Sequence, residues 1–261
     1  MTGFLMRRSR AGFAAWLMLP ALIGTIMLGS VMTGPAQAAE TDNVDLLLVL
    51  AADVSRSVDQ TKFELQRQGY AAAVTDRRVL DTIRSGLLGR IAICFVEWSG
   101  AAAQKLVIDW TVIDGAPAAK AFADKLVELP RSFADRTAIG SGIDFAVAQL
   151  ARAPFSSKRR TIDVSGDGTS NSGRDVDGAR DAATAQDITI NGLVILSERP
   201  LPWNPEHTNP PGGLAQYYRD HVIGGRGAFV MTAKTFESFG EAIIGKLVAE
   251  IAMRTDAGSA R

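Results

Sequence analysis

Aspartate and hydroxyl side chains follow directly after two apolar runs of the sequence. Asp53, Ser55 and Ser57 come after the run VDLLLVLAA, and Asp167 comes after a shorter run that ends at Ser165. Carboxylate and hydroxyl oxygens are the ligands that hard divalent cations such as Mg²⁺, Mn²⁺ and Ca²⁺ prefer. Because alternate residues of an Asp-x-Ser-x-Ser turn can point at one centre, these residues predict a metal site.

Thr137 lies just before a predicted helix and offers a further hydroxyl to this site. Two carboxylates that face a dication leave a site that is nearly neutral and short of one strong ligand. Such a site can recruit a carboxylate from outside the chain. The predicted cofactor is therefore Mg²⁺ or Mn²⁺, with Ca²⁺ as a further candidate, and the predicted partner is an acidic residue of another protein.

Simpler roles for the same residues remain open. Ser57 could cap a helix that begins at Val58, although capping does not explain Asp53. Asp167 and Gly168 could form a plain turn. An EF-hand that starts at Asp167 fails, because a serine stands at the position of the sharp-turn glycine and a glycine at that of the closing glutamate. No Gly-x-Ser-x-Gly elbow and no P-loop lysine motif occurs.

Alternating strands and helices must position these segments. Hydrophobic patterns predict strands over 44–52, 90–98, 104–110, 160–165, 188–196 and 227–232. They predict helices over 58–83, 118–129, 139–150, 175–186, 214–222 and 235–253. The alternation indicates a doubly wound α/β fold with a mostly parallel six-stranded sheet and helices on both faces, in which 104–110 is an antiparallel hairpin strand. Ligands of such sheets bind at the carboxyl ends of the strands, where the polar segments lie.

The three segments resemble the metal-ion-dependent adhesion site of von Willebrand factor A domains. Asp53, Ser55 and Ser57 match that family's Asp-x-Ser-x-Ser loop. Thr137 matches the threonine of its second loop, and Asp167 matches the aspartate of its third. The resemblance implies that these five residues hold the metal in a Rossmann-like fold.

The sequence is more closely similar to a group of exported bacterial proteins of this class that have no assigned function. The shared phrases are DVSRSVD (53–59), VEWSG (96–100), DVSGDG (163–168) and YYRD (217–220). The resemblance covers about 44–252. Arg136 stands where a glycine is more usual in the broad family.

Three further residues are expected near the site or at its rim: Arg56, Glu97 and Gly168. If Arg56 points inward it weakens metal binding, and if it points outward it can pair with an acidic partner. Glu97 is either an indirect partner of the metal or a solvated strand end.

The N-terminus has the pattern of a secretory signal peptide. Basic residues precede an apolar stretch over 11–32, and Ala36-Gln37-Ala38 offers a cleavage site. Cleavage after Ala38 leaves a mature protein of net charge −3 that is periplasmic or secreted. The alternative is an uncleaved anchor, since the apolar part is long enough to span a bilayer. The expected organisation is a signal peptide (1–38), one A-type domain (39–253) and a polar tail (254–261).

Composition excludes several other functions. The 28 basic and 28 acidic residues leave no basic excess for nucleic acid. One cysteine, Cys94, permits neither an intramolecular disulfide nor a cysteine-based zinc site, and we expect it to be a buried small apolar residue. We expect His207 and His221 to be surface residues. Trp203 is either an exposed contact residue or a cover for the sheet edge.

Two functions of different class fit these features. The favoured one is a binding module, not an enzyme, that uses its cation to capture an acidic residue of a partner protein. The alternative is a metal-dependent hydrolase of phosphate or ester substrates. The alternative needs a general base, for which the sequence offers Glu97.

Overall fold

Six strands form the central sheet of the domain. The strands are β1 (Leu47–Asp53), β2 (Ile91–Trp98), β3 (Gln104–Ile113), β4 (Arg160–Gly166), β5 (Thr189–Ile195) and β6 (Val230–Ala233). Their spatial order is β3-β2-β1-β4-β5-β6. β3 runs antiparallel to β2, and the other neighbours pair in parallel. The computed structural model describes residues 43–196, 202 and 204–253, and it confirms the predicted fold class.

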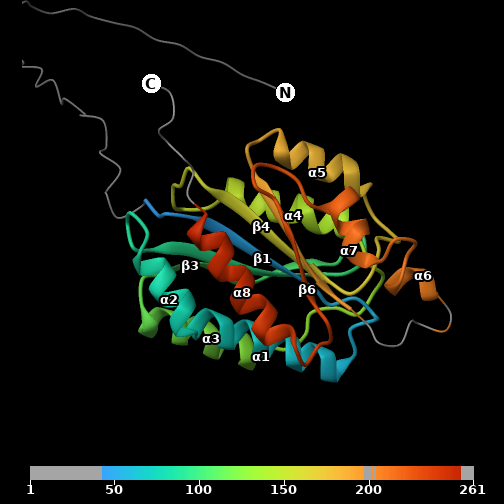
Figure 1. Cartoon of the computed structure of the whole chain (residues 1–261), viewed down its shortest axis with the longest axis horizontal. Helices are drawn as coiled ribbons and strands as arrows, with labels where there is room; N and C mark the ends of the chain where they lie inside the picture. Colours follow the sequence, from blue (N-terminus) through green and yellow to red (C-terminus); the bar gives the residue numbers. More distant parts are fainter. Residues whose placement is uncertain (1–42, 197–201, 203, 254–261) are drawn as a thin grey trace, which may run out of the picture. The chain divides into compact units, whose positions relative to one another are not determined.

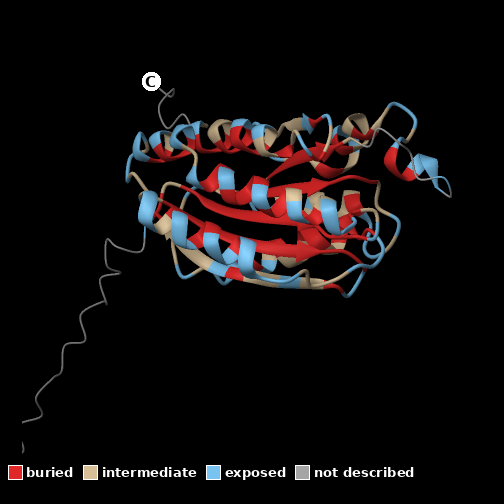
Figure 2. Ribbon diagram, turned by 90° about the horizontal axis from the view of Figure 1, so that it is seen from below, coloured by how far each residue is buried: buried red, intermediate tan, exposed pale blue. Residues whose placement is uncertain are grey.

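Helices cover both faces of this sheet. They are α1 (Gln60–Thr75), α2 (Arg77–Arg84), α3 (Ala116–Glu128), α4 (Ile139–Ala151), α5 (Val176–Thr184), α6 (Pro205–Thr208), α7 (Leu214–Tyr217), the π-helical turn η2 (Tyr218–Val222) and α8 (Phe239–Ala252). α1, α2, α3 and α8 lie on one face, and α4, α5 and η2 on the other (Figure 1). In Figure 2 the buried strands lie between helices whose outward sides are exposed.

The long apolar runs of β1 and β2 reflect burial on both faces. All seven residues of β1 and all eight of β2 are buried. Because side chains alternate across a strand, Leu48 and Leu50 enter the core on the α1 and α8 side, whereas Leu47 and Val49 enter the core beneath α4. Burial of each such side chain stabilises the fold by about 1.5–3 kcal/mol. Cys94 in β2 is buried among these residues, as predicted.

The helix predicted over 58–83 is two helices. Asp76 has an extended conformation between α1 and α2, and its side chain accepts a 2.7 Å hydrogen bond from the main-chain N–H of Arg78. An aspartate cap of this kind starts a new helix. The last helix begins at Phe239 rather than at the predicted Thr235.

The order in which the chain adds strands to the sheet reverses at β1. The chain proceeds outward from β1 to β2 and β3 and then returns to β4 on the other side of β1. The carboxyl ends of β1 and β4 therefore flank the switch point of the sheet, where ligands of doubly wound folds bind.

Several predictions concern residues outside the described ones: the signal peptide, the polar tail and Trp203. In the parts that are described, none of the helices has the length and apolar character to cross a bilayer.

Candidate metal centre

The switch point brings together the residues predicted from separate segments. Asp53 is the last residue of β1, and Asp167 directly follows β4. Thr137 lies in the segment that leads into α4. The exposed fraction is 0% for Asp53 and Asp167 and 1% for Ser55 and Thr137, so the polar groups are almost fully removed from bulk water.

A chain of hydrogen bonds joins the first and third segments. Asp53 Oδ1 accepts a 2.6 Å hydrogen bond from the main-chain N–H of Ser55. The hydroxyl oxygens of Ser55 and Ser57 lie 3.1 Å apart, and the Ser57 hydroxyl donates to Asp167 Oδ1 at 2.5 Å. The helix cap is Asp59, which accepts from the main-chain N–H of Lys62, so the alternative that Ser57 caps this helix is wrong.

Each carboxylate keeps one oxygen without a partner. Among the described residues, no group donates a hydrogen bond to Asp53 Oδ2 or to Asp167 Oδ2, and both atoms are buried. Burial and the negative charge of Asp167 raise the pKa of Asp53 to about 8. Buried polar atoms without partners destabilise a fold, and a dication would satisfy both oxygens and offset both charges. The residues present therefore fit a divalent cation.

Thr137 reaches this site through a neighbouring loop. Its main-chain N–H donates to Asn171 Oδ1 at 3.0 Å, and its carbonyl oxygen accepts from the Asn171 N–H at 2.8 Å. The Thr137 hydroxyl lies 3.4 Å from His207 Nε2. Thus the loop after β4 fixes the threonine segment, and the threonine hydroxyl lies beside the His207 imidazole.

His207 in α6 is the main addition to the site. It is 5% exposed, so the expectation of a surface residue is wrong for this histidine. A Cβ atom at Gly168 would collide with the imidazole ring, and so the glycine is needed for the ring to approach. Burial lowers the pKa of His207, which favours the neutral ring. His221 is 43% exposed and lies 2.9 Å from an Asp177 carboxylate oxygen.

Tyr218 in η2 adds a third group without a partner. Its hydroxyl is buried and has no hydrogen bond among the described residues. A Cβ atom at Gly166 would lie 2.5 Å from this hydroxyl and 3.1 Å from Asp53 Oδ2, which places the tyrosine beside the carboxylate. Burial and the charge of Asp53 raise the pKa of Tyr218, so its hydroxyl keeps its proton and can act as a donor.

Two cationic side chains border the carboxylates. Lys62 Nζ lies 3.5 Å from Asp167 Oδ2 and donates to the carbonyl oxygen of Ser57 at 2.8 Å. Arg131 donates to the carbonyl oxygens of Val54 and Ser55 at 2.6 and 2.7 Å, which holds the first loop in place. Lys62 could have been found from the sequence, because it lies five residues after Ser57 within a predicted helix. No nearby sequence motif marks Arg131.

The expected rim residues have different positions. Arg56 is exposed, which corresponds to the outward alternative. Glu97 is 0% exposed, so the solvated strand end is wrong. Glu97 accepts from Arg67 at 2.6 Å and from the main-chain N–H of Ser132 at 2.8 Å, and no hydrogen bond or ion pair joins it to the five predicted ligands. It acts on the site indirectly, by holding the segment that carries Arg131.

The donor set is rich in hydroxyl groups. Nowhere in 43–196 or 204–253 do three or more His, Cys, Asp or Glu side chains gather as a potential metal site. The candidate centre therefore depends on two carboxylates supplemented by serine and threonine. Such a set suits hard cations better than a cluster of histidines and cysteines would.

Three solved structures share this architecture. The von Willebrand factor type A structure from Catenulispora acidiphila covers 80% of this chain and 43% of its own, at 16% identity and a TM-score of 0.52. The pilus adhesin SpaC from Lactobacillus rhamnosus GG covers 80% and 31%, at 11% identity and a TM-score of 0.58. Proximal thread matrix protein 1 from the mussel byssus, with a zinc-occupied MIDAS motif, covers 80% and 48%, at 14% identity and a TM-score of 0.55.

The chain spans less than half the length of each of these proteins. Their likeness and the sheet order define the fold of a von Willebrand factor A domain, which confirms the resemblance inferred from the sequence. Within this class, the chain belongs to the family described as "Protein of unknown function (DUF1194)", whose model matches residues 43–255. No curated protein matches the sequence.

Proposed function

We propose that this protein is an exported binding module that holds a divalent cation and captures an acidic residue of a partner protein. The observation that supports it is the pair of buried carboxylate oxygens, Asp53 Oδ2 and Asp167 Oδ2, which have no hydrogen-bond partner among the described residues. Such atoms are costly in a folded protein unless a ligand satisfies them.

The ligand set is Asp53, Ser55, Ser57, Thr137 and Asp167. Asp53 and Asp167 supply the charge, and the serine hydroxyls bridge between them. A bound cation would supply a positive point to which an external carboxylate can bind. Arg56 lies exposed beside this point and can contact an acidic partner, so the rim selects the partner.

The geometry supports binding rather than hydrolysis. Glu97, which the hydrolase alternative needs as its base, is paired with Arg67 and does not reach the carboxylates. His207 faces threonine hydroxyls with both ring nitrogens, each at 3.4 Å. SpaC is a pilus adhesin and the byssus protein is a thread matrix protein, and both descriptions agree with an adhesive role. Turnover of generic phosphate or ester substrates with Mg²⁺ or Mn²⁺ would contradict this proposal.

Metal binding is tested by thermal unfolding. Because the ligands converge only in the folded chain, a cation at about 100 times its Kd stabilises the protein by about 2.7 kcal/mol, or roughly 5–10 °C in Tm. We expect this rise in Mg²⁺ or Mn²⁺ relative to EDTA, and its absence in Asp53→Ala. Asp124→Ala, an exposed aspartate on α3, is the matched control. Coinciding wild-type curves at millimolar cation would refute the metal site.

Capture is tested by pull-down from an envelope extract. The partner should be released by EDTA and lost with Asp167→Ala, and one acidic residue of the partner should be essential. Binding that survives both EDTA and Asp53→Ala places the interface elsewhere.

The exported state is tested separately. Mass spectrometry of the N-terminus in the native host should find the mature chain beginning at Ala39. A mature protein that still carries Arg7 and Arg8 favours the anchor.

A further inference from the structure

A second polar cavity lies at the opposite end of the sheet from the candidate metal centre. It has a volume of about 510 Å³ and opens at the amino ends of β4 and β5. The last turn of α8 and the glycine-rich turn around Arg226 complete its wall. This volume is within the range of small-molecule sites, about 300–1,000 Å³.

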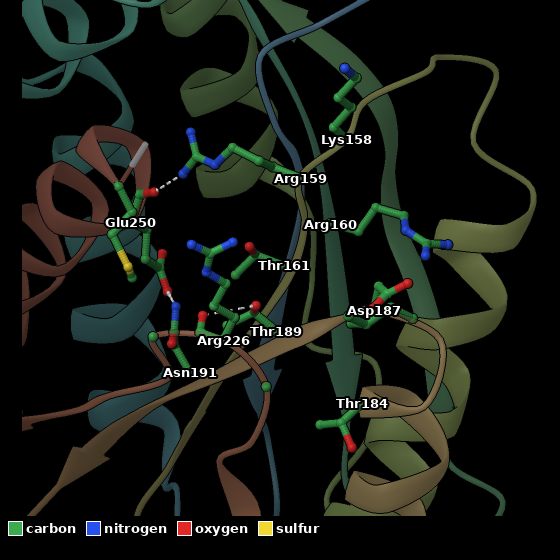
Figure 3. A pocket seen from close by; sticks show the side chains of 14 residues that line it. Lys158, Arg159, Arg160, Thr161, Thr184, Asp187, Thr189, Asn191, Arg226 and Glu250 are labelled. Atoms are coloured by element: carbon green, nitrogen blue, oxygen red, sulfur yellow. Dashed lines mark hydrogen bonds between the residues drawn. The ribbon is translucent and has the colours of Figure 1, made fainter. Parts of the chain in front are cut away.

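Four cationic side chains line this cavity, and in Figure 3 that of Lys158 points away from that of Arg226. They are Lys158, Arg159, Arg160 and Arg226. Arg159 donates to the main-chain carbonyl oxygens of Glu250 and Ile251, and Arg160 donates to that of Gln186. None of the four forms an ion pair with a carboxylate in the described part of the chain, and Lys158 and Arg226 have no side-chain hydrogen bond there. The lining also holds two carboxylates, those of Asp187 and Glu250, so cationic side chains outnumber carboxylates in the cavity wall by four to two.

The inner wall of the cavity is polar and buried. Asn191 and Glu250 line it and are 1% and 2% exposed. Asn191 Nδ2 donates to Glu250 Oε1 at 2.8 Å, while Glu250 Oε2 is buried without a hydrogen-bond partner in the described residues. The inner wall thus offers an acceptor to a ligand, whereas the rim offers cations. A ligand that fits both has an anionic group and a hydroxyl group.

Phosphate is the anion that this rim suits best. Guanidinium groups donate in a planar fork that matches phosphate oxygens, and two or more cations offset a dianion better than a monoanion. Thr161 and Thr189 add hydroxyls to the same wall. We propose that this cavity binds a phosphate group with a hydroxylated substituent, that the exposed side chains of Lys158 and Arg226 turn toward the phosphate to contact it, and that Glu250 accepts from the substituent hydroxyl.

Two sources can present this chemistry: a soluble phosphorylated polyol or the headgroup of an anionic phospholipid. Asn43, where the described chain begins, is bridged to Ser156, two residues before Lys158. The cavity therefore lies close to the point where the described chain begins. The experiment separates the two sources.

The soluble arm is calorimetric titration with glycerol 3-phosphate in EDTA and 150 mM salt. The Lys158→Ala/Arg226→Ala variant should bind at least about tenfold more weakly, because it loses charge-assisted hydrogen bonds. Arg77→Ala/Lys120→Ala removes the same charge from exposed helix positions and should bind as the wild type does. Propyl phosphate, which has no hydroxyl, should bind more weakly than glycerol 3-phosphate.

The vesicle arm is cosedimentation with phosphatidylglycerol and with phosphatidylcholine vesicles. Binding to glycerol 3-phosphate supports a soluble ligand, and binding only to phosphatidylglycerol vesicles supports a lipid headgroup, provided that the cavity variant loses it and the control keeps it. Absence of binding in both arms, or equal loss in both variants, overturns the proposal. Equal affinity for propyl phosphate overturns the role of Glu250. Because EDTA is present throughout, none of these outcomes depends on the metal centre.

Discussion

Two pairs of buried carboxylates lie along the same part of the sheet, and they are completed in different ways. Asp163, in the middle of β4, shares Lys246 with Glu250: Lys246 Nζ lies 2.7 Å from Asp163 Oδ1 and 2.5 Å from Glu250 Oε1, and all three side chains are 0% exposed. Asp167, just beyond β4, faces Asp53, and its neighbour Lys62 lies 3.5 Å away with 26% of its side chain exposed. The inner pair contains its own cation, whereas the outer pair has only the peripheral cations Lys62 and Arg131.

The pKa values express the same difference. Burial is the largest cause in both cases, and it raises the pKa of Asp53 to about 8 and that of Asp163 to about 7. The next cause differs in sign. The charge of Asp167 raises the pKa of Asp53 further, while Lys246 lowers that of Asp163. The outer pair thus remains electrostatically incomplete in the chain alone, as expected of a site that binds a cation from solution.

The largest effect is expected when the inner pair loses its cation. Lys246→Met leaves two buried carboxylates without a counter-charge, and breaking a buried pair in this way destabilises a protein by about 3–5 kcal/mol. Urea unfolding at pH 7 measures the loss. The loss should shrink at pH 5, where Asp163, whose pKa burial raises to about 7, binds a proton.

The matched control is Lys120→Met on the exposed side of α3, where the pair with Asp124 contributes less than about 1 kcal/mol. A Lys246→Met loss as small as that of this control would show that the inner cluster is not held by its lysine.

Loss of a charge from the outer pair should have the opposite effect on the free energy of unfolding. Asp53→Asn removes one of two facing carboxylates, so in EDTA we expect equal or higher stability than wild type. In saturating Mg²⁺ or Mn²⁺ the variant should lack the stabilisation of about 2.7 kcal/mol that the wild type shows at 100 times Kd. Chemical unfolding in both conditions gives the two values. A variant that is less stable in EDTA would mean that the carboxylate is a structural acceptor.

The outer pair should also make stability depend on pH. The pKa of Asp53 is about 8 in the folded chain and about 3.9 in an unfolded one, so the folded state binds more protons between these values. The free energy of unfolding in EDTA should therefore fall as the pH rises from 5 to 8. Asp163 acts in the same direction, and so Asp53→Asn should reduce the slope without removing it. A slope that Asp53→Asn leaves unchanged would assign the effect to Asp163.

The smallest effect concerns Lys62. Its ammonium competes with a metal for Asp167, and at a separation of 3.5 Å, with the lysine partly in solvent, the pair contributes about 0.2–1 kcal/mol. Lys62→Met should therefore raise metal affinity about 1.5–5-fold, measured by titration calorimetry, with Lys120→Met unchanged. Weaker metal binding in Lys62→Met would instead make the lysine a support of the loop, through its hydrogen bond to the Ser57 carbonyl oxygen.

The sequence predicted the parts of the site that local order determines. Asp53 and Asp167 directly follow apolar runs, so their place at the strand ends depends only on recognising the strands. The contacts made by His207 and Tyr218 were missed, because they depend on how the segment over 204–222 folds back across the sheet. No periodic pattern in the sequence predicts where this segment lies against the sheet.

The inner cluster was missed for a different reason. Lys246 and Glu250 lie four residues apart within the apolar stripe of α8, beside Leu247 and Ile251, and this placement was a usable signal. Charged residues on a buried face must have partners in the core. The identity of the third member, Asp163, could not be predicted, because it depends on which strand α8 crosses.

The two outer strands of the sheet make poor templates for another chain. β6 has only four residues, and β3 pairs with β2 through register shifts around Phe95 and carries exposed Lys105 and Asp109. Short length, irregular register and charge all hinder the addition of a strand to an open edge. The domain is consequently protected against edge-to-edge aggregation, and both edges disfavour the extension of the sheet by a strand from another chain.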